Sequence, residues 1–94
     1  MTYVKLRHKV QDVAAWKATF DGAIKMRKAS GEKSYQIWNT ENDPNNLFLL
    51  FEWDNLTNAK KFLGSTELKT AMKKAGVIEE PEVRFLNEIT RGKV

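Results

Sequence analysis

The fold is decided by one strongly apolar stretch of the chain, Leu47-Phe48-Leu49-Leu50-Phe51-Glu52-Trp53. Side chains of a β-strand alternate between two faces. One face here carries Leu47, Leu49, Phe51 and Trp53, and the other carries Phe48, Leu50 and Glu52. Because both faces are mostly apolar, both should be covered. The rest of the chain supplies only enough helix for one face, so we expect a second copy of the chain to cover the other.

The segments around this strand predict the order strand, helix, strand, strand, helix, strand. Alternating side chains predict strands over residues 3–10, 33–39 and 83–89, and helical spacing predicts helices over residues 13–30 and 56–75. With right-handed crossovers, this order favours a ferredoxin-like βαββαβ fold of the α+β class. We expect a single domain over residues 1–94, with an antiparallel four-stranded sheet and two helices on one face.

Capping and turn residues support these boundaries. Asp12 and Asn55 are suitable helix N-caps, and Gly31 is a natural residue to follow the first helix. Gly64-Ser65 should interrupt the second helix. The segment Asn42-Asp43-Pro44-Asn45-Asn46 is a dense turn signal, which makes the second and third strands a hairpin.

The composition is that of a folded chain: 94 residues, 41% hydrophobic and 30% charged. The absence of cysteine excludes a disulfide framework, a thiolate nucleophile and a cysteine metal site. No apolar run approaches the roughly 18–20 residues that span a bilayer. Lys5, Arg7 and Lys9 interrupt the apolar core that a signal peptide needs. We therefore expect a cytoplasmic protein with no membrane partner.

Charge and motifs narrow the function classes further. The net charge of +4 permits acidic partners without requiring them. The sequence contains no glycine-rich phosphate loop and no Ser-His-Asp order, and its single histidine argues against a protein-only transition-metal site. Residues 47–53 lack the glycine and basic residue that RNA-recognition domains of this element order carry on a central strand. We expect no nucleic acid, no metal and no cofactor.

Three stretches carry a resemblance to a known family: Arg7-His8-Lys9-Val10 followed by Asp12 and Trp16-Lys17; Phe51-Glu52-Trp53-Asp54; and Glu67-Leu68-Lys69 through Ala75-Gly76-Val77. Over residues 2–89 the chain resembles the dimeric α+β barrel proteins of the antibiotic-biosynthesis-monooxygenase-like superfamily. The resemblance implies two sheets that meet face to face. It implies a range of activities: cofactor-independent oxygenation of aromatic polyketides, haem degradation, cyclisation or isomerisation. The haem-degrading branch holds iron through a histidine on the second helix, which this sequence lacks.

His8 is the candidate catalytic residue. It shares a strand face with Val4, Leu6 and Val10, so a helix carrying Trp16 and Phe20 would enclose it. One interpretation is a general acid or base beside a hydrophobic ligand. The other is a structural histidine bonded to a backbone carbonyl or a helix end.

Aromatic side chains are abundant for so short a chain. Trp16, Trp38, Phe20 and Phe51 are the candidate substrate-binding residues, because a flat aromatic molecule would suit a pocket of such side chains. The alternative is that they are simply core residues.

Four residues are candidates for the interior of a dimer barrel: Arg7, Glu52, Phe48 and Leu50. Arg7 and Glu52 lie on neighbouring strands in the ferredoxin-like order, so they are expected to pair there and to fix register. A catalytic carboxylate at Glu52 is the alternative.

Two functional hypotheses follow. The first is a cofactor-independent monooxygenase, or a cyclase or isomerase, acting on a small hydrophobic, aromatic or polyketide-like molecule. The second is a non-catalytic dimeric module that binds a small ligand or serves a stress response. An open pocket beside His8 would favour the first, and a filled core the second.

Overall fold

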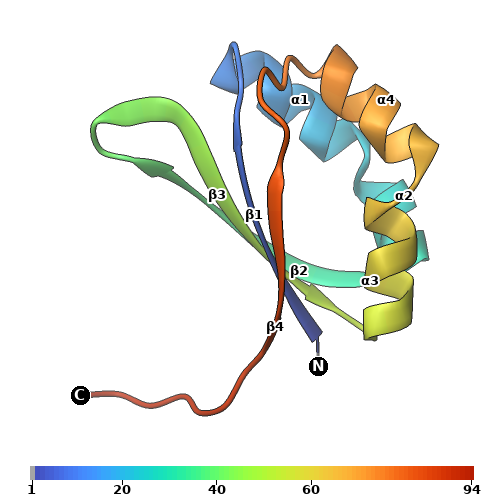
Figure 1. Cartoon of the computed structure of the whole chain (residues 1–94), viewed down its shortest axis with the longest axis vertical. Helices are drawn as coiled ribbons and strands as arrows, with labels where there is room; N and C mark the ends of the chain where they lie inside the picture. Colours follow the sequence, from blue (N-terminus) through green and yellow to red (C-terminus); the bar gives the residue numbers. More distant parts are fainter. Residues whose placement is uncertain (1) are drawn as a thin grey trace.

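The computed structural model describes residues 2–94, which form one antiparallel sheet with all the helices on one face (Figure 1). The strand order is β2-β3-β1-β4, so the ferredoxin-like α+β fold is confirmed. The elements in chain order are β1 (Thr2–Lys9), α1 (Val13–Gly22), α2 (Ile24–Ser30), β2 (Glu32–Thr40), β3 (Asp43–Trp53), α3 (Leu56–Leu63), α4 (Thr66–Lys74) and β4 (Glu82–Asn87).

The apolar stretch forms most of β3, which lies inside the sheet between β2 and β1. Its first face packs under the helices, and every residue of that face is buried: Leu47, Leu49, Phe51 and Trp53. On the other face, which we call the open face, Phe48 and Leu50 remain half-buried. No helix of the described chain covers the open face (Figure 1).

Strand pairing decides which side chains of β1 face the helices. His8 is paired with Leu47 and Leu6 with Leu49. Directly opposite residues of an antiparallel pair point to the same face. His8 therefore lies on the helix-covered face, where it is 2% exposed.

The hairpin between β2 and β3 is tighter than its sequence suggests. The turn signal over residues 42–46 predicts a loop, but β3 already begins at Asp43. Pro44 is accommodated because it lies beyond the end of β1, where Lys9 pairs with Asn46, and beside a register shift next to Thr40. Strand ends and bulges are the places where a sheet tolerates proline.

The prediction of one continuous helix over residues 13–30 is wrong. In a continuous helix the carbonyl of Phe20 would accept the N–H of Ile24. It accepts instead the N–H of Ala23, at 3.2 Å, and the Nη1 of Arg27. The helix therefore ends at Gly22 and restarts at Ile24.

The remaining helix boundaries agree with the sequence. Asp12, Asn55 and Ser65 are N-caps whose side chains accept backbone N–H groups, and Ser65 separates α3 from α4 as expected. Gly31 ends α2 with a φ of 117°, and a Cβ at this position would lie 2.5 Å from the Oδ1 atom of Asp54. Glycine is required there both by the backbone conformation and by the close approach.

The expected Arg7–Glu52 pair does not form within the chain. Glu52 is paired with Tyr3, four residues from Arg7 and so about 13 Å along the strand. The Nε atom of Arg7 instead lies 2.8 Å from Glu82, and Glu52 accepts a hydrogen bond of 3.1 Å from Ser34. The registers of β1 with β3 and β4 place Glu82, and not Glu52, opposite Arg7, and sequence spacing does not reveal these registers.

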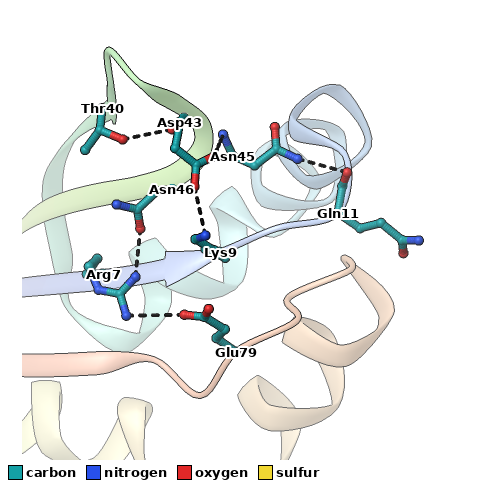
Figure 2. A network of polar contacts seen from close by, with 8 residues as sticks. All are labelled: Arg7, Lys9, Gln11, Thr40, Asp43, Asn45, Asn46 and Glu79. Atoms are coloured by element: carbon teal, nitrogen blue, oxygen red, sulfur yellow. Dashed lines mark hydrogen bonds and ion pairs between the residues drawn. The ribbon is translucent and has the colours of Figure 1, made fainter.

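Arg7 belongs to a polar network at the end of β1 near the β2–β3 turn (Figure 2). Its Nη1 atom donates to Asn46 at 2.7 Å and its Nη2 atom lies 3.3 Å from Glu79. Lys9 pairs with Asp43 at 2.9 Å in the same region. The network joins β1 to β3 and to the segment before β4.

Candidate functional site

A cavity of about 80 Å³ lies between the sheet and the helices. Its walls are mostly apolar, with Leu6 and Leu49 from the sheet and Met72 from α4 among them. Three charged or ionisable side chains also line it: His8, Arg27 and Glu32. Polar groups placed in an apolar cavity are typical of ligand sites.

His8 lies at one end of the cavity. The edge of its ring meets the ring of Trp16 at 5.5 Å between centroids. Within the described residues, neither its Nδ1 nor its Nε2 atom has a hydrogen-bond partner, so the backbone carbonyl or helix end expected of a structural histidine is not bonded to it. Burial, together with the nearby charge of Arg7, lowers the pKa of His8 to about 4. The imidazole is neutral at pH 7, with one nitrogen able to donate and the other able to accept.

Three of the four candidate substrate-binding aromatics line this cavity. Trp16 and Phe20 stack at 5.0 Å, and Phe20 lies 6.2 Å from Phe51. Trp38 is the exception: it pairs with Phe48, lies on the open face and is 49% exposed. The expectation that Trp38 lines the pocket is wrong, because strand alternation places it on the side of Gln36 rather than of Ile37.

A buried ion pair forms a second polar part of the cavity wall. The Nε atom of Arg27 lies 3.0 Å from the Oε2 atom of Glu32, and both side chains are buried. The Arg27 guanidinium also stacks on the ring of Phe20, at 3.6 Å from its centroid. Burial raises the pKa of Glu32, while the hydrogen bond and the charge of Arg27 oppose that rise.

Trp53 adjoins this ion pair. It is the cross-strand partner of Glu32 and is 1% exposed, with its indole 5.2 Å from the ring of Phe62. His8 is opposite Leu47, six residues earlier in β3, so about 20 Å of strand separates the two polar regions. We call the residues Arg27, Glu32 and Trp53 the Arg27 cluster.

Both polar regions of the cavity wall, His8 and the Arg27 cluster, contain buried polar atoms that have no hydrogen-bond partner among the described residues. Among residues 2–94, the buried side-chain nitrogens and oxygens that lack any hydrogen bond are His8 Nδ1 and Nε2, Arg27 Nη2, Glu32 Oε1 and Trp53 Nε1. All of these residues line the same cavity. Buried polar groups in proteins are nearly always hydrogen-bonded. These atoms are therefore available to hydrogen-bond a ligand or water in the cavity.

The sequence reasoning missed Arg27 and Glu32 as site residues. For Arg27 a signal existed, because it follows Trp16, Phe20 and Ala23 at helical spacing on the apolar face. For Glu32 the alternation of β2 is misleading. A register shift between Glu32 and Ser34 turns Glu32 to the helix-covered face, although simple alternation would put the two residues on the same side.

Within residues 2–94, no group of three or more His, Asp or Glu side chains is placed to hold a metal ion. The helices of that same range are too short and too polar to cross a bilayer.

Solved structures share this arrangement of strands and helices. A crystal structure of an antibiotic biosynthesis monooxygenase superposes with a TM-score of 0.70, at 10% identity over 96% of this chain and 100% of that one. SnoaB, a cofactor-independent oxygenase from Streptomyces nogalater, gives a TM-score of 0.75 at 11% identity, over 96% of this chain and 94% of that one. The chain has the fold of the antibiotic-biosynthesis-monooxygenase-like superfamily.

A further solved structure has the same fold. A Bordetella bronchiseptica protein, described as a candidate antibiotic biosynthesis monooxygenase, gives a TM-score of 0.77 at 17% identity, over 95% of this chain and 98% of that one. No protein-family model matches the sequence. No curated protein matches it either. The likeness therefore concerns the fold alone.

Proposed function

We propose that this protein is a cofactor-independent monooxygenase that acts on a small, hydrophobic, aromatic molecule bound in the cavity. The observation that carries the proposal is His8, a buried imidazole in the cavity wall with no hydrogen-bond partner among the described residues. The aromatic surfaces of Trp16, Phe20 and Phe51 would hold a flat ring beside it. The fold shared with SnoaB, a cofactor-independent oxygenase, supports the same activity.

The proposed role of His8 is to accept a proton from the substrate. Conversion of a CH₂ group to a carbonyl follows CH₂ + O₂ → C=O + H₂O, which needs no external reductant. Loss of a proton from the CH₂ group makes the molecule rich enough in electrons to react with O₂. A neutral imidazole can accept that proton, and the substrate anion beside it would stabilise the imidazolium. The low pKa of His8 keeps the imidazole unprotonated at neutral pH but also makes it a weak base, so the transfer depends on the substrate anion raising that pKa.

Entry of an aromatic ring requires the cavity to enlarge. Its volume of about 80 Å³ is below the ~150 Å³ of an engineered apolar cavity that holds benzene. The wall best suited to move is α4, which contributes Leu68, Ala71 and Met72 but has no buried residue. Methionine side chains adapt readily to a new neighbour. We propose that α4 shifts outward when substrate enters.

The proposed assembly is a homodimer joined through the open face. Phe48 and Leu50 lie there half-buried, and Trp38, opposite Phe48, is 49% exposed. Leu86, at 40% exposure, lies on the same face but on β4, across β1 from β3. Large apolar side chains exposed on the uncovered face of a sheet are typical of interaction sites. A second copy supplies a matching sheet, as expected from the doubly apolar character of β3.

Oxygen uptake and product mass test the proposed reaction. Purified protein, with no added cofactor, is incubated with a panel of one- to three-ring aromatic ketones that carry an acidic CH₂ group. Uptake of one O₂ for each carbonyl formed is the expected result, and His8→Ala should lower the rate about a hundredfold or more. The melting temperature of His8→Ala is the control that the variant is folded.

The same measurements separate the alternatives. Conversion without O₂ uptake would show a cyclase or isomerase. Binding of several panel members without any conversion would show a ligand-binding module, and the monooxygenase proposal would be wrong. A His8→Ala variant that turns substrate over at the unmodified rate would remove His8 from the mechanism.

A further inference from the structure

The Arg27 cluster presents a defined set of hydrogen-bonding atoms with no partner in the described chain. Arg27 Nη2 and Trp53 Nε1 are donors, and Glu32 Oε1 is an acceptor. Each of these residues is more than nine-tenths buried and lines the cavity. The cross-strand pairing of Glu32 with Trp53 and the 3.0 Å contact of Arg27 with Glu32 keep the three side chains together.

We infer that the Arg27 cluster is a recognition subsite for a neutral hydroxyl group carried on an aromatic ring. Such a hydroxyl donates a hydrogen bond to Glu32 and, with two acceptor lone pairs, can accept from Arg27 and from Trp53. The inference rests on the proposed function, because it names the substrate class of the same cavity.

Charge distinguishes a hydroxyl from an anionic group. Arg27 is already paired with Glu32, so the cluster has no net charge to offer a carboxylate while Glu32 is ionised. A ligand carboxylate would lie against the unpartnered Oε1 atom of Glu32 and be repelled. A hydroxyl meets both the donors and the acceptor without adding charge to a buried site.

Recognition of a hydroxyl by the Arg27 cluster can be tested by comparing the affinities of the cavity for two ring compounds of nearly equal size. Phenol and toluene differ by a hydroxyl in place of a methyl. A purely apolar cavity favours toluene, because the phenol hydroxyl loses its hydrogen bonds to water without replacement. A cavity that contains unpartnered donors and an acceptor should instead bind phenol more tightly than toluene. The affinities should differ by about tenfold if the hydroxyl bonds a charged group.

The experiment measures the dissociation constants of phenol, toluene and benzoate by calorimetry, for the intact protein and three variants. Trp53→Phe removes the indole N–H and keeps a ring, and should reduce the preference for phenol over toluene about fivefold. Glu32→Gln replaces the free acceptor, since its amide oxygen pairs with Arg27 and leaves an NH₂ group toward the hydroxyl. It should reduce the preference about tenfold. Trp38→Phe makes the same change as Trp53→Phe on the open face and should leave the preference unaltered.

The outcomes separate this inference from the proposed function. Tighter binding of phenol than of toluene and of benzoate, lost in Trp53→Phe or Glu32→Gln but kept in Trp38→Phe, supports the subsite. Equal binding of phenol and toluene, or tighter toluene binding, overturns the subsite and leaves an apolar ligand cavity intact. Tightest binding of benzoate overturns the neutral-hydroxyl assignment. Binding of none of the probes overturns the subsite and the proposed function together. If Glu32→Gln fails to fold, the Trp53→Phe and Trp38→Phe pair decides the result.

Discussion

His8 should make the protein less stable as the pH falls from about 6.5 to about 4. Its pKa is about 4 in the folded chain, against an ordinary value of 6.5. At about 1.4 kcal/mol for each pKa unit, the difference amounts to about 3 kcal/mol of unfolding free energy. This is a large part of the stability of a small domain.

The sign follows from proton binding. Between pH 4 and 6.5 the unfolded chain protonates His8 and the folded chain does not, so the free energy of unfolding rises with pH in that window. Glu32 acts in the opposite direction. Burial raises its pKa, so it contributes stability as the pH falls through its folded pKa. The hydrogen bonds from Arg7 and Lys9 lower the pKa values of Glu82 and Asp43, which adds a loss of stability toward more acidic pH.

A variant that cannot titrate isolates the contribution of His8. His8→Leu places an apolar side chain in an apolar site and removes a polar group that has no partner in the described chain. Urea unfolding of both proteins is followed at pH 7, 6, 5 and 4.5, at constant ionic strength and protein concentration. The unmodified protein should lose about 2–3 kcal/mol more than His8→Leu over this range. Equal losses in the two proteins would show that the pKa of His8 is not lowered.

Three further changes test other parts of the structure. Leu50→Lys puts a charge on the open face and should convert a dimer to monomers or unfold it; light scattering that gives the mass of one chain for the unmodified protein would refute the dimer. Gly31→Ala should cost at least about 1–3 kcal/mol in thermal melting, because its φ is 117° and the new Cβ would lie 2.5 Å from Asp54; an unchanged melting temperature would contradict this. Arg27→Leu and Glu32→Leu should each cost about 3–5 kcal/mol, and the double variant should recover much of that loss in urea unfolding; additive losses would show that the two side chains are not coupled.

The local sequence pattern was sufficient to predict the sheet and the face of the sheet on which His8 lies. The alternation in β3 places Leu47 and Trp53 on the helix-covered face, and the alternation in β1 places His8 on the same face. These assignments depend only on the period of two along a strand. The same rule, applied to β2, puts Trp38 on the open face together with Gln36, away from the cavity.

The other end of the cavity could not be predicted, because it depends on departures from regular structure. The register shift beside Glu32 reverses the face that this residue occupies. The break after Gly22 depends on Arg27, whose side chain bonds the Phe20 carbonyl. The partners of Arg7 depend on the register of β4. Interactions of this kind arise from tertiary packing, which local pattern does not contain.

Nuclear magnetic resonance tests the central claim, that the cavity between the sheet and the helices binds small aromatic molecules. His8 is the single histidine and Trp53 is one of three tryptophans, so the imidazole and indole nitrogens give few signals. On titration with phenol, the signal of the Trp53 indole N–H should shift because it lies in the Arg27 cluster, while that of Trp38, on the open face, stays in place. Shifts confined to Trp38, or no shift at saturating phenol, would contradict the account.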